Sequence, residues 1–141
     1  MRDIFPYSKY YWYPHMKPND IEIWERFIEK NPEEYDYVQY DFNVGDPPPF
    51  NTLMDDGEDL NQDALYRLKI DVIGHKNNYV DIIEVKPNAS PSTIGQLEGY
   101  KALYLRDEPT DKKIIMTIIT DKERPNMNYL CREKGIRLVV V

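Results

Sequence analysis

The sequence predicts one α/β domain with a mixed central sheet flanked by helices. The chain has 141 residues, which is enough for a single domain with a hydrophobic core. Runs of β-branched residues alternate with segments of helical apolar periodicity. A tight hairpin makes neighbouring strands antiparallel, whereas strands joined through a helix become parallel. The expected order is helix, strand, hairpin of two strands, helix, strand, short helix and strand.

A helix and an alternating strand come first. We expect Asn19 or Asp20 to cap a helix that runs to about Lys30, because Asn31-Pro32 then ends it. Its apolar side comprises Ile21, Trp24, Phe27 and Ile28. Residues 35–45 alternate like a strand, and residues 66–74 and 79–86 read as two strands joined by a loop at 74–78.

The second half of the chain predicts a helix, a strand, a short helix and a final strand. Ser90 is a capping residue and Pro91 suits the first helical position of a helix to about Leu105. Residues 112–120 are nearly all apolar, as in a buried central strand. A short helix at 126–134 is expected to end at Gly135, before a strand that completes the chain.

Two segments stand apart from this core. Residues 1–18 form an aromatic arm with five aromatic side chains between Tyr7 and Tyr13. It could stack on bases, bind a protein or lie on its own sheet, and its interrupting prolines and few basic residues favour the last two. Residues 46–63 form a Pro/Asp-rich loop, which could be a flap over a nucleic-acid groove, a docking segment for a protein partner or a plain insertion, the default interpretation.

Asp71, Glu84 and Lys86 fall at the ends of the two hairpin strands. Side chains alternate along a strand, so Glu84 and Lys86 share the face of Val80 and Ile82. If Asp71 pairs opposite Ile82, its carboxylate lies on that same face, diagonal to Glu84. A register shift of one residue would send it to the other face.

Two carboxylates at the mouth of a pocket suit a hard divalent cation, Mg²⁺ or Mn²⁺, which takes phosphate and water oxygens as its other ligands. Lys86 would hold or help deprotonate the attacking water and add positive charge in the transition state. The alternative interpretation is that Glu84 and Lys86 form a solvated pair at a strand end.

The next helix supplies further candidates. Gln96 and Tyr100 lie one turn apart near its N-terminal end, close to where Lys86 leaves the sheet. The positive end of this helix would also point towards a bound phosphate. For each residue alone, an exposed helix position for Gln96 and a core aromatic for Tyr100 remain alternatives.

These residues resemble the motifs of the PD-(D/E)xK nuclease superfamily, in particular its RecB-like and Holliday-junction-resolvase-like branches. Asp71, Glu84 and Lys86 match the aspartate and the ExK motif, and Gln96 with Tyr100 is similar to the QxxxY helix motif. Ile70 precedes Asp71 where the motif name has proline. The resemblance covers residues 64–141 and implies that 19–141 form one domain with a restriction-endonuclease-like αβββαβ core.

The resemblance also implies roles for these residues. Asp71, Glu84 and the backbone carbonyl of Val85 would be ligands of Mg²⁺ or Mn²⁺, and Lys86 would be the catalytic lysine. A further glutamate of the first helix, Glu22 or Glu25, would join the site. The expected function is a metal-dependent DNA endonuclease or exonuclease.

The charge distribution argues for weak unaided DNA binding. The net charge is −7, which repels DNA at long range. Residues 1–63 carry 5 basic and 15 acidic side chains, whereas residues 64–141 carry 13 and 10, so the segment with the motif is mildly basic. A tethering partner would compensate, through the arm or the loop.

The alternative function is that of a tailed-phage virion or head-to-tail assembly component, because the layout also resembles head-completion nucleases. No apolar run reaches membrane-spanning length, and the first ten residues lack the apolar core of a secretory signal peptide. We therefore expect no membrane partner and a cytoplasmic location, which would be the host cytoplasm or the virion for a phage protein.

Overall fold

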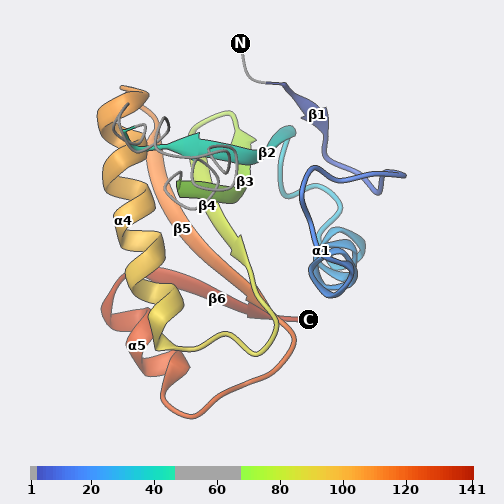
Figure 1. Cartoon of the computed structure of the whole chain (residues 1–141), viewed down its shortest axis with the longest axis vertical. Coiled ribbons are helices and arrows are strands. Elements are labelled where there is room, and N and C mark those ends of the chain that lie inside the picture. The colour runs from blue at the N-terminus through green and yellow to red at the C-terminus, as the bar shows by residue number, and fades with distance from the viewer. Residues whose placement is uncertain (1–2, 47–67) are drawn as a thin grey trace, which may run out of the picture.

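The computed structural model describes residues 3–46 and 68–141, so the predicted loop at 46–63, apart from Asp46, lies outside the described residues. Figure 1 shows the arrangement of the elements. In chain order they are β1 (Phe5–Pro6), α1 (Pro18–Lys30), β2 (Tyr37–Val44), β3 (Leu68–Lys76), β4 (Tyr79–Val85), α4 (Pro91–Asp107), β5 (Lys113–Thr120), α5 (Met127–Glu133) and β6 (Ile136–Val140).

The strands form one mixed sheet in the order β1-β2-β3-β4-β5-β6. Neighbours from β1 to β4 are antiparallel, whereas β4, β5 and β6 are parallel. The reason is connectivity, because β3 and β4 are joined by a two-residue turn and the later strands are joined through helices. The predicted α/β class with a mixed sheet is confirmed, and its restriction-endonuclease-like character stays a prediction.

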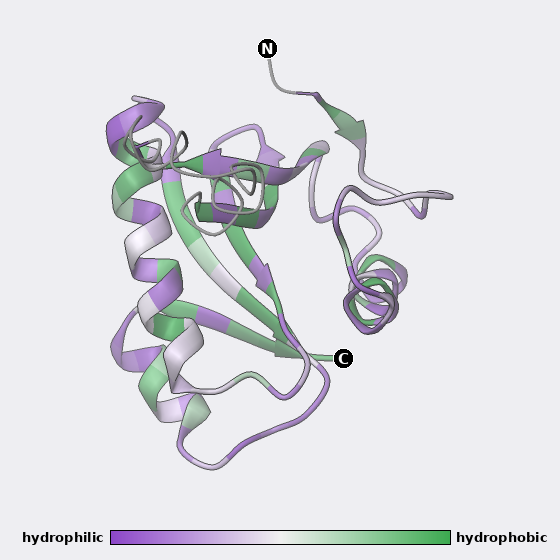
Figure 2. Cartoon of the chain, in the orientation of Figure 1, coloured by the Kyte–Doolittle hydropathy of each residue, from purple (hydrophilic) through white to green (hydrophobic). Residues whose placement is uncertain are grey.

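Helices cover both faces of the sheet. α4 and α5 lie over one face and α1 over the other (Figure 1). Hydrophobic residues are concentrated on the strands, most plainly on β5, between these helices (Figure 2). The core under α4 includes Ile82 and Leu97, and the core under α1 includes Trp24, Phe27 and Ile83. None of the helices described here is long and apolar enough to cross a membrane.

The antiparallel β2–β3 pair turns its side chains to a different face of the sheet midway along its length. Asp41 has a positive φ of 50°, a conformation that Asp tolerates better than most residues. The residue pairs on either side of Asp41 belong to different cores although they are only two residues apart, so the two paired strands are strongly twisted there. The pairs are Tyr40 with Val72 under α1 and Phe42 with Ile70 under α4.

Most predicted elements are present, with two corrections. α1 begins at Pro18 with Lys17 as its N-cap, so neither Asn19 nor Asp20 is the capping residue. Pro18 suits this first position because its missing N–H has no helical partner there. β1, which the sequence did not predict, is only two residues long.

Part of the N-terminal arm packs on its own domain. Tyr13 is buried at 4% exposure, and its hydroxyl donates a hydrogen bond to Glu25 Oε2 at 2.7 Å. The Tyr7 hydroxyl donates to the backbone oxygen of Asn31 at 2.5 Å. Tyr11 and Trp12 nevertheless stay exposed, at 89% and 54%.

Replacement of Gly74 by Ala is expected to destabilise the fold by about 1–3 kcal/mol, because the new methyl group would overpack the core. A Cβ at Gly74 would lie 2.6 Å from ring atoms of Tyr35. The control is Gly99→Ala in α4, where a Cβ meets nothing within 4 Å and the change should stabilise by up to about 1 kcal/mol. Urea unfolding of both variants checks this, and equal stabilities would contradict it.

Candidate active site

A cleft of about 700 Å³ opens at the C-terminal end of β4, beside the N-terminus of α1. β4 contributes its last residues and the segment that follows, β3 contributes one aspartate, and the arm and α1 form the opposite wall. The lining residues are His15, Lys17, Pro18, Asn19, Asp20, Asp71, Glu84, Val85, Lys86 and Pro87.

Asp71 faces Glu84 across the β3–β4 pair. Val72 pairs with Ile83, so the next position on β3 lies opposite Glu84 and not opposite Ile82 as predicted. The two registers differ by two residues, which preserves the face. Asp71 Oδ2 accepts the Val85 N–H at 3.0 Å, so a side chain replaces the backbone partner at this point of the ladder. The N–H and C=O of one strand residue point to the same side, which directs the Val85 carbonyl towards β3 as well.

Glu84 is the more buried carboxyl of the pair. It is 7% exposed, and its Oε1 has no hydrogen-bond partner among the described residues. Burial raises the pKa of Glu84, and the neighbouring Asp71 charge raises it further. Burial also raises the pKa of Asp71, against the opposing effect of the Val85 N–H. Ionising both of these adjacent buried carboxyls is unfavourable, because burial and the repulsion between two negative charges each raise the free energy of the doubly ionised form. The pair therefore retains a proton near neutral pH.

The opposite wall brings a third carboxylate and two lysines. Asp20, in the first turn of α1, is close enough for its charge to raise the pKa values of both Asp71 and Glu84. Lys17 and exposed Lys86 also line the cleft. The cleft therefore has an acidic floor with cationic side chains at its rim.

The other predicted site residues do not line the cleft. Tyr100 is buried, and burial, together with the charges of Glu84 and Asp71, raises its pKa to about 12. It therefore lies within electrostatic reach of the pair. Gln96 is exposed on α4 and does not line the cleft. Glu25 is held by Tyr13, and Glu22 is exposed and also absent from the cleft.

The helix at the cleft also differs from the expected one. Residues of the first turn of α1 line the cleft, whereas the first turn of α4 does not. From the sequence, Asp20 was expected only as a possible helix cap, and neither Lys17 nor His15 was among the predicted site residues. Their one sequence signal is that they flank a helix start, where backbone N–H groups favour anions.

The donor set fits a hard divalent cation in part. Across residues 3–46 and 68–141, no cluster of three or more His, Cys, Asp or Glu side chains is arranged to hold a metal ion. Asp71 and Glu84 nevertheless offer adjacent carboxylate oxygens, and the buried Glu84 Oε1 is an acceptor without a hydrogen-bond donor among the described residues. Backbone, water or substrate oxygens would have to complete the coordination shell.

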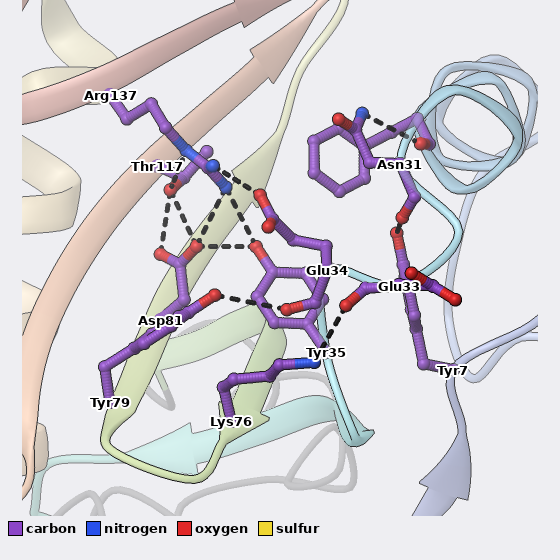
Figure 3. Close-up of polar contacts among 11 residues, drawn as sticks. Tyr7, Asn31, Glu33, Glu34, Tyr35, Lys76, Tyr79, Asp81, Thr117 and Arg137 are labelled. Atoms are coloured by element: carbon purple, nitrogen blue, oxygen red, sulfur yellow. Dashed lines mark hydrogen bonds and ion pairs between the residues drawn. The ribbon is translucent and has the colours of Figure 1, made fainter.

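A second buried carboxylate, Asp81, lies on the other face of β4 and belongs to a polar network (Figure 3). Asp81 is 0% exposed. It accepts hydrogen bonds from the Tyr35 hydroxyl at 2.6 Å and from the Thr117 hydroxyl at 2.8 Å. Arg137 Nη2 lies 3.3 Å from it, and Arg137 also contacts Glu34. All of these groups are partnered, so the network fastens β4, β5 and β6 to the segment after α1.

Metal-free protein is expected to lose stability as the pH rises from about 4 into the alkaline range. The Asp71 and Glu84 pKa values are raised in the folded state, so the unfolded chain ionises first and is favoured as protons leave. Thermal unfolding in chelator at pH 5 and pH 8 measures this. Glu84→Gln is the control, because it removes the Glu84 titration and leaves in place the opposing effect of His75, whose pKa burial lowers to about 4. An identical pH dependence in the variant would contradict the assignment.

Comparison with protein-family models, curated proteins and solved structures found no match to this chain.

Proposed function

We propose that this protein is a metal-dependent DNA nuclease that hydrolyses phosphodiester bonds in the cleft at the end of β4. The observation that supports this most is the buried Asp71–Glu84 pair, which opens into a cleft with Lys86 at its rim. Two adjacent buried carboxyls cost stability unless a proton or cation joins them. Burial without an evident structural benefit is typical of functional sites.

Asp71, Glu84 and the Val85 carbonyl would hold Mg²⁺ or Mn²⁺, and Asp20 is the further carboxylate that borders the same space. When bound, such a cation acidifies water and neutralises charge that develops on phosphorus. The carboxyl pair has to release its proton before it binds the cation, so we expect cation affinity to rise with pH.

The remaining groups act on the substrate. Lys17 and Lys86 supply positive charge for a phosphate that would otherwise meet three carboxylates. The N-terminal end of α1 adds partial positive charge at the same wall. Lys86, two residues beyond Glu84 and exposed, is positioned to orient or deprotonate the water that attacks the phosphate.

The test is cation binding by calorimetry, together with cleavage of supercoiled, linear, single-stranded and branched DNA in Mg²⁺ and in Mn²⁺. We expect stoichiometric binding and cation-dependent cutting of at least one of these DNAs. A folded protein that neither binds cation nor cuts any of them would overturn the proposal and would favour the assembly role considered for the sequence.

A further inference from the structure

A second cavity adjoins the cleft. It has a volume of about 320 Å³ and lies between the arm and the surface of β2. His15 lines both cavities, so the second begins where the rim of the cleft ends. Its wall from the arm includes Phe5 and Trp12, and its floor on β2 includes Gln39, Asp41 and Asn43.

Trp12 provides an unused aromatic surface in this cavity. Its side chain is 54% exposed, and among the described residues its ring has no ring partner, unlike Tyr7, Tyr10 and Tyr13 of the same arm. An exposed tryptophan at a cavity wall is a favourable stacking surface for a flat ligand.

The polar lining selects the chemistry of that ligand. Asp3 and Asp41 border the cavity and, in the described part of the chain, no lysine or arginine does, so a phosphate would be repelled. His15 Nε2 and Lys69 Nζ lie 3.5 and 3.7 Å from Asp41 Oδ2, and the lysine charge partly neutralises this carboxylate. Carboxylate and carboxamide groups can instead accept hydrogen bonds from the exocyclic amines of nucleobases.

We propose that this cavity binds one unpaired nucleobase of the strand whose phosphate lies in the cleft. The inference rests on the proposed nuclease function and specifies its substrate as DNA that is single-stranded next to the scissile bond. A base inside a duplex is stacked and paired, and it cannot enter without being extruded. Stacking also supplies affinity that an acidic chain of net charge −7 cannot obtain from phosphate attraction alone.

The first arm of the test is binding without divalent cation, so that cleavage plays no part. A single-stranded oligonucleotide should quench the fluorescence of Trp12, while Trp24, at 0% exposure, remains a constant background. Trp12→Ala should weaken binding of a labelled oligonucleotide about tenfold, and Trp12→Phe should retain most of the affinity. The control is Tyr129→Ala, which removes an aromatic of 62% exposure from α5.

The second arm compares cleavage of single-stranded and duplex DNA by wild type and Trp12→Ala. A loss confined to the single-stranded substrate supports the inference. Unchanged binding and unchanged cutting in Trp12→Ala overturn it, even if wild type is an active nuclease. Binding that depends on Trp12 in a protein that cuts no DNA supports the base site and counts against the proposed nuclease, so the two proposals fail separately.

Discussion

Replacement of Glu84 by Gln is expected to lower cation-dependent DNA cleavage by about 10²-fold or more. Gln keeps the volume of the side chain but cannot supply the negative oxygen that a divalent cation needs. Calorimetry should show weakened cation binding in the same variant. Lys86→Ala should lower cleavage to a similar extent while it leaves cation binding largely intact, because its ammonium acts on water and phosphate.

Glu84→Gln should leave the fold intact. The alternative interpretation placed Glu84 in a solvated pair at a strand end, but its side chain is buried at 7% exposure. Its stability effect therefore depends on its proton. At neutral pH the carboxyl pair already retains one, and a Gln amide can donate to Asp71 in its place, so the unfolding free energy should change by no more than about 1 kcal/mol.

A matched control for the Glu84 variant is Glu98→Gln on α4, whose carboxylate is 44% exposed and lies 3.8 Å from Lys134 Nζ. It should retain full cleavage. If Glu98→Gln and Glu84→Gln lose activity equally, the loss comes from general charge effects and not from the cleft. A Glu84→Gln protein that is strongly destabilised would indicate a structural role instead.

The sequence was most informative where local patterns decide the outcome. Alternation in the β4 segment placed Glu84 on the face of Val80 and Ile82, and the structure contains the predicted hairpin between residues 66 and 86. The register was wrong by two residues, because the predicted five-residue loop is a turn of only two between Lys76 and Tyr79. A shift of two keeps the face, so Asp71 still meets Glu84.

The sequence did not predict how elements far apart in the chain pack against one another. Helical periodicity shows which side of α1 is apolar but not which end of the helix reaches the strand ends, so Glu22 and Glu25 were considered where the structure brings Asp20. Similarly, Asp81 was not among the predicted site residues, and two of its partners, Tyr35 and Arg137, are separated from it by 46 and 56 positions. Such contacts depend on strand order, which local propensity does not encode.

Replacement of Asp81 by Ala is expected to destabilise the protein by about 3 kcal/mol, the largest stability effect we predict. The change leaves the Tyr35 and Thr117 hydroxyls without their acceptor and Arg137 without its buried partner. Urea unfolding at neutral pH measures the loss. Burial raises the pKa of Asp81 to about 6, so at pH 7 the carboxylate is charged and the pair with Arg137 is present.

The matched control is Asp36→Ala, which removes a carboxylate that is 44% exposed and lies 3.5 Å from Lys76 Nζ. Exposed pairs contribute about 0–1 kcal/mol, so this variant should remain near wild type. A similar small loss in Asp81→Ala would contradict the role of the network.

The Asp81 network also allows stability to be separated from chemistry at the cleft. Asp81 and Glu84 lie three residues apart on opposite faces of β4, so one strand carries both. Well below its unfolding temperature, Asp81→Ala should therefore cut DNA at nearly the wild-type rate, whereas Glu84→Gln should be stable and inactive. In the double variant Asp81→Ala/Arg137→Ala the destabilisation should be smaller than the sum of the single losses, because both substitutions remove the same pair. Additive losses would show that Arg137 stabilises the fold through Glu34 and Phe27 and not through Asp81.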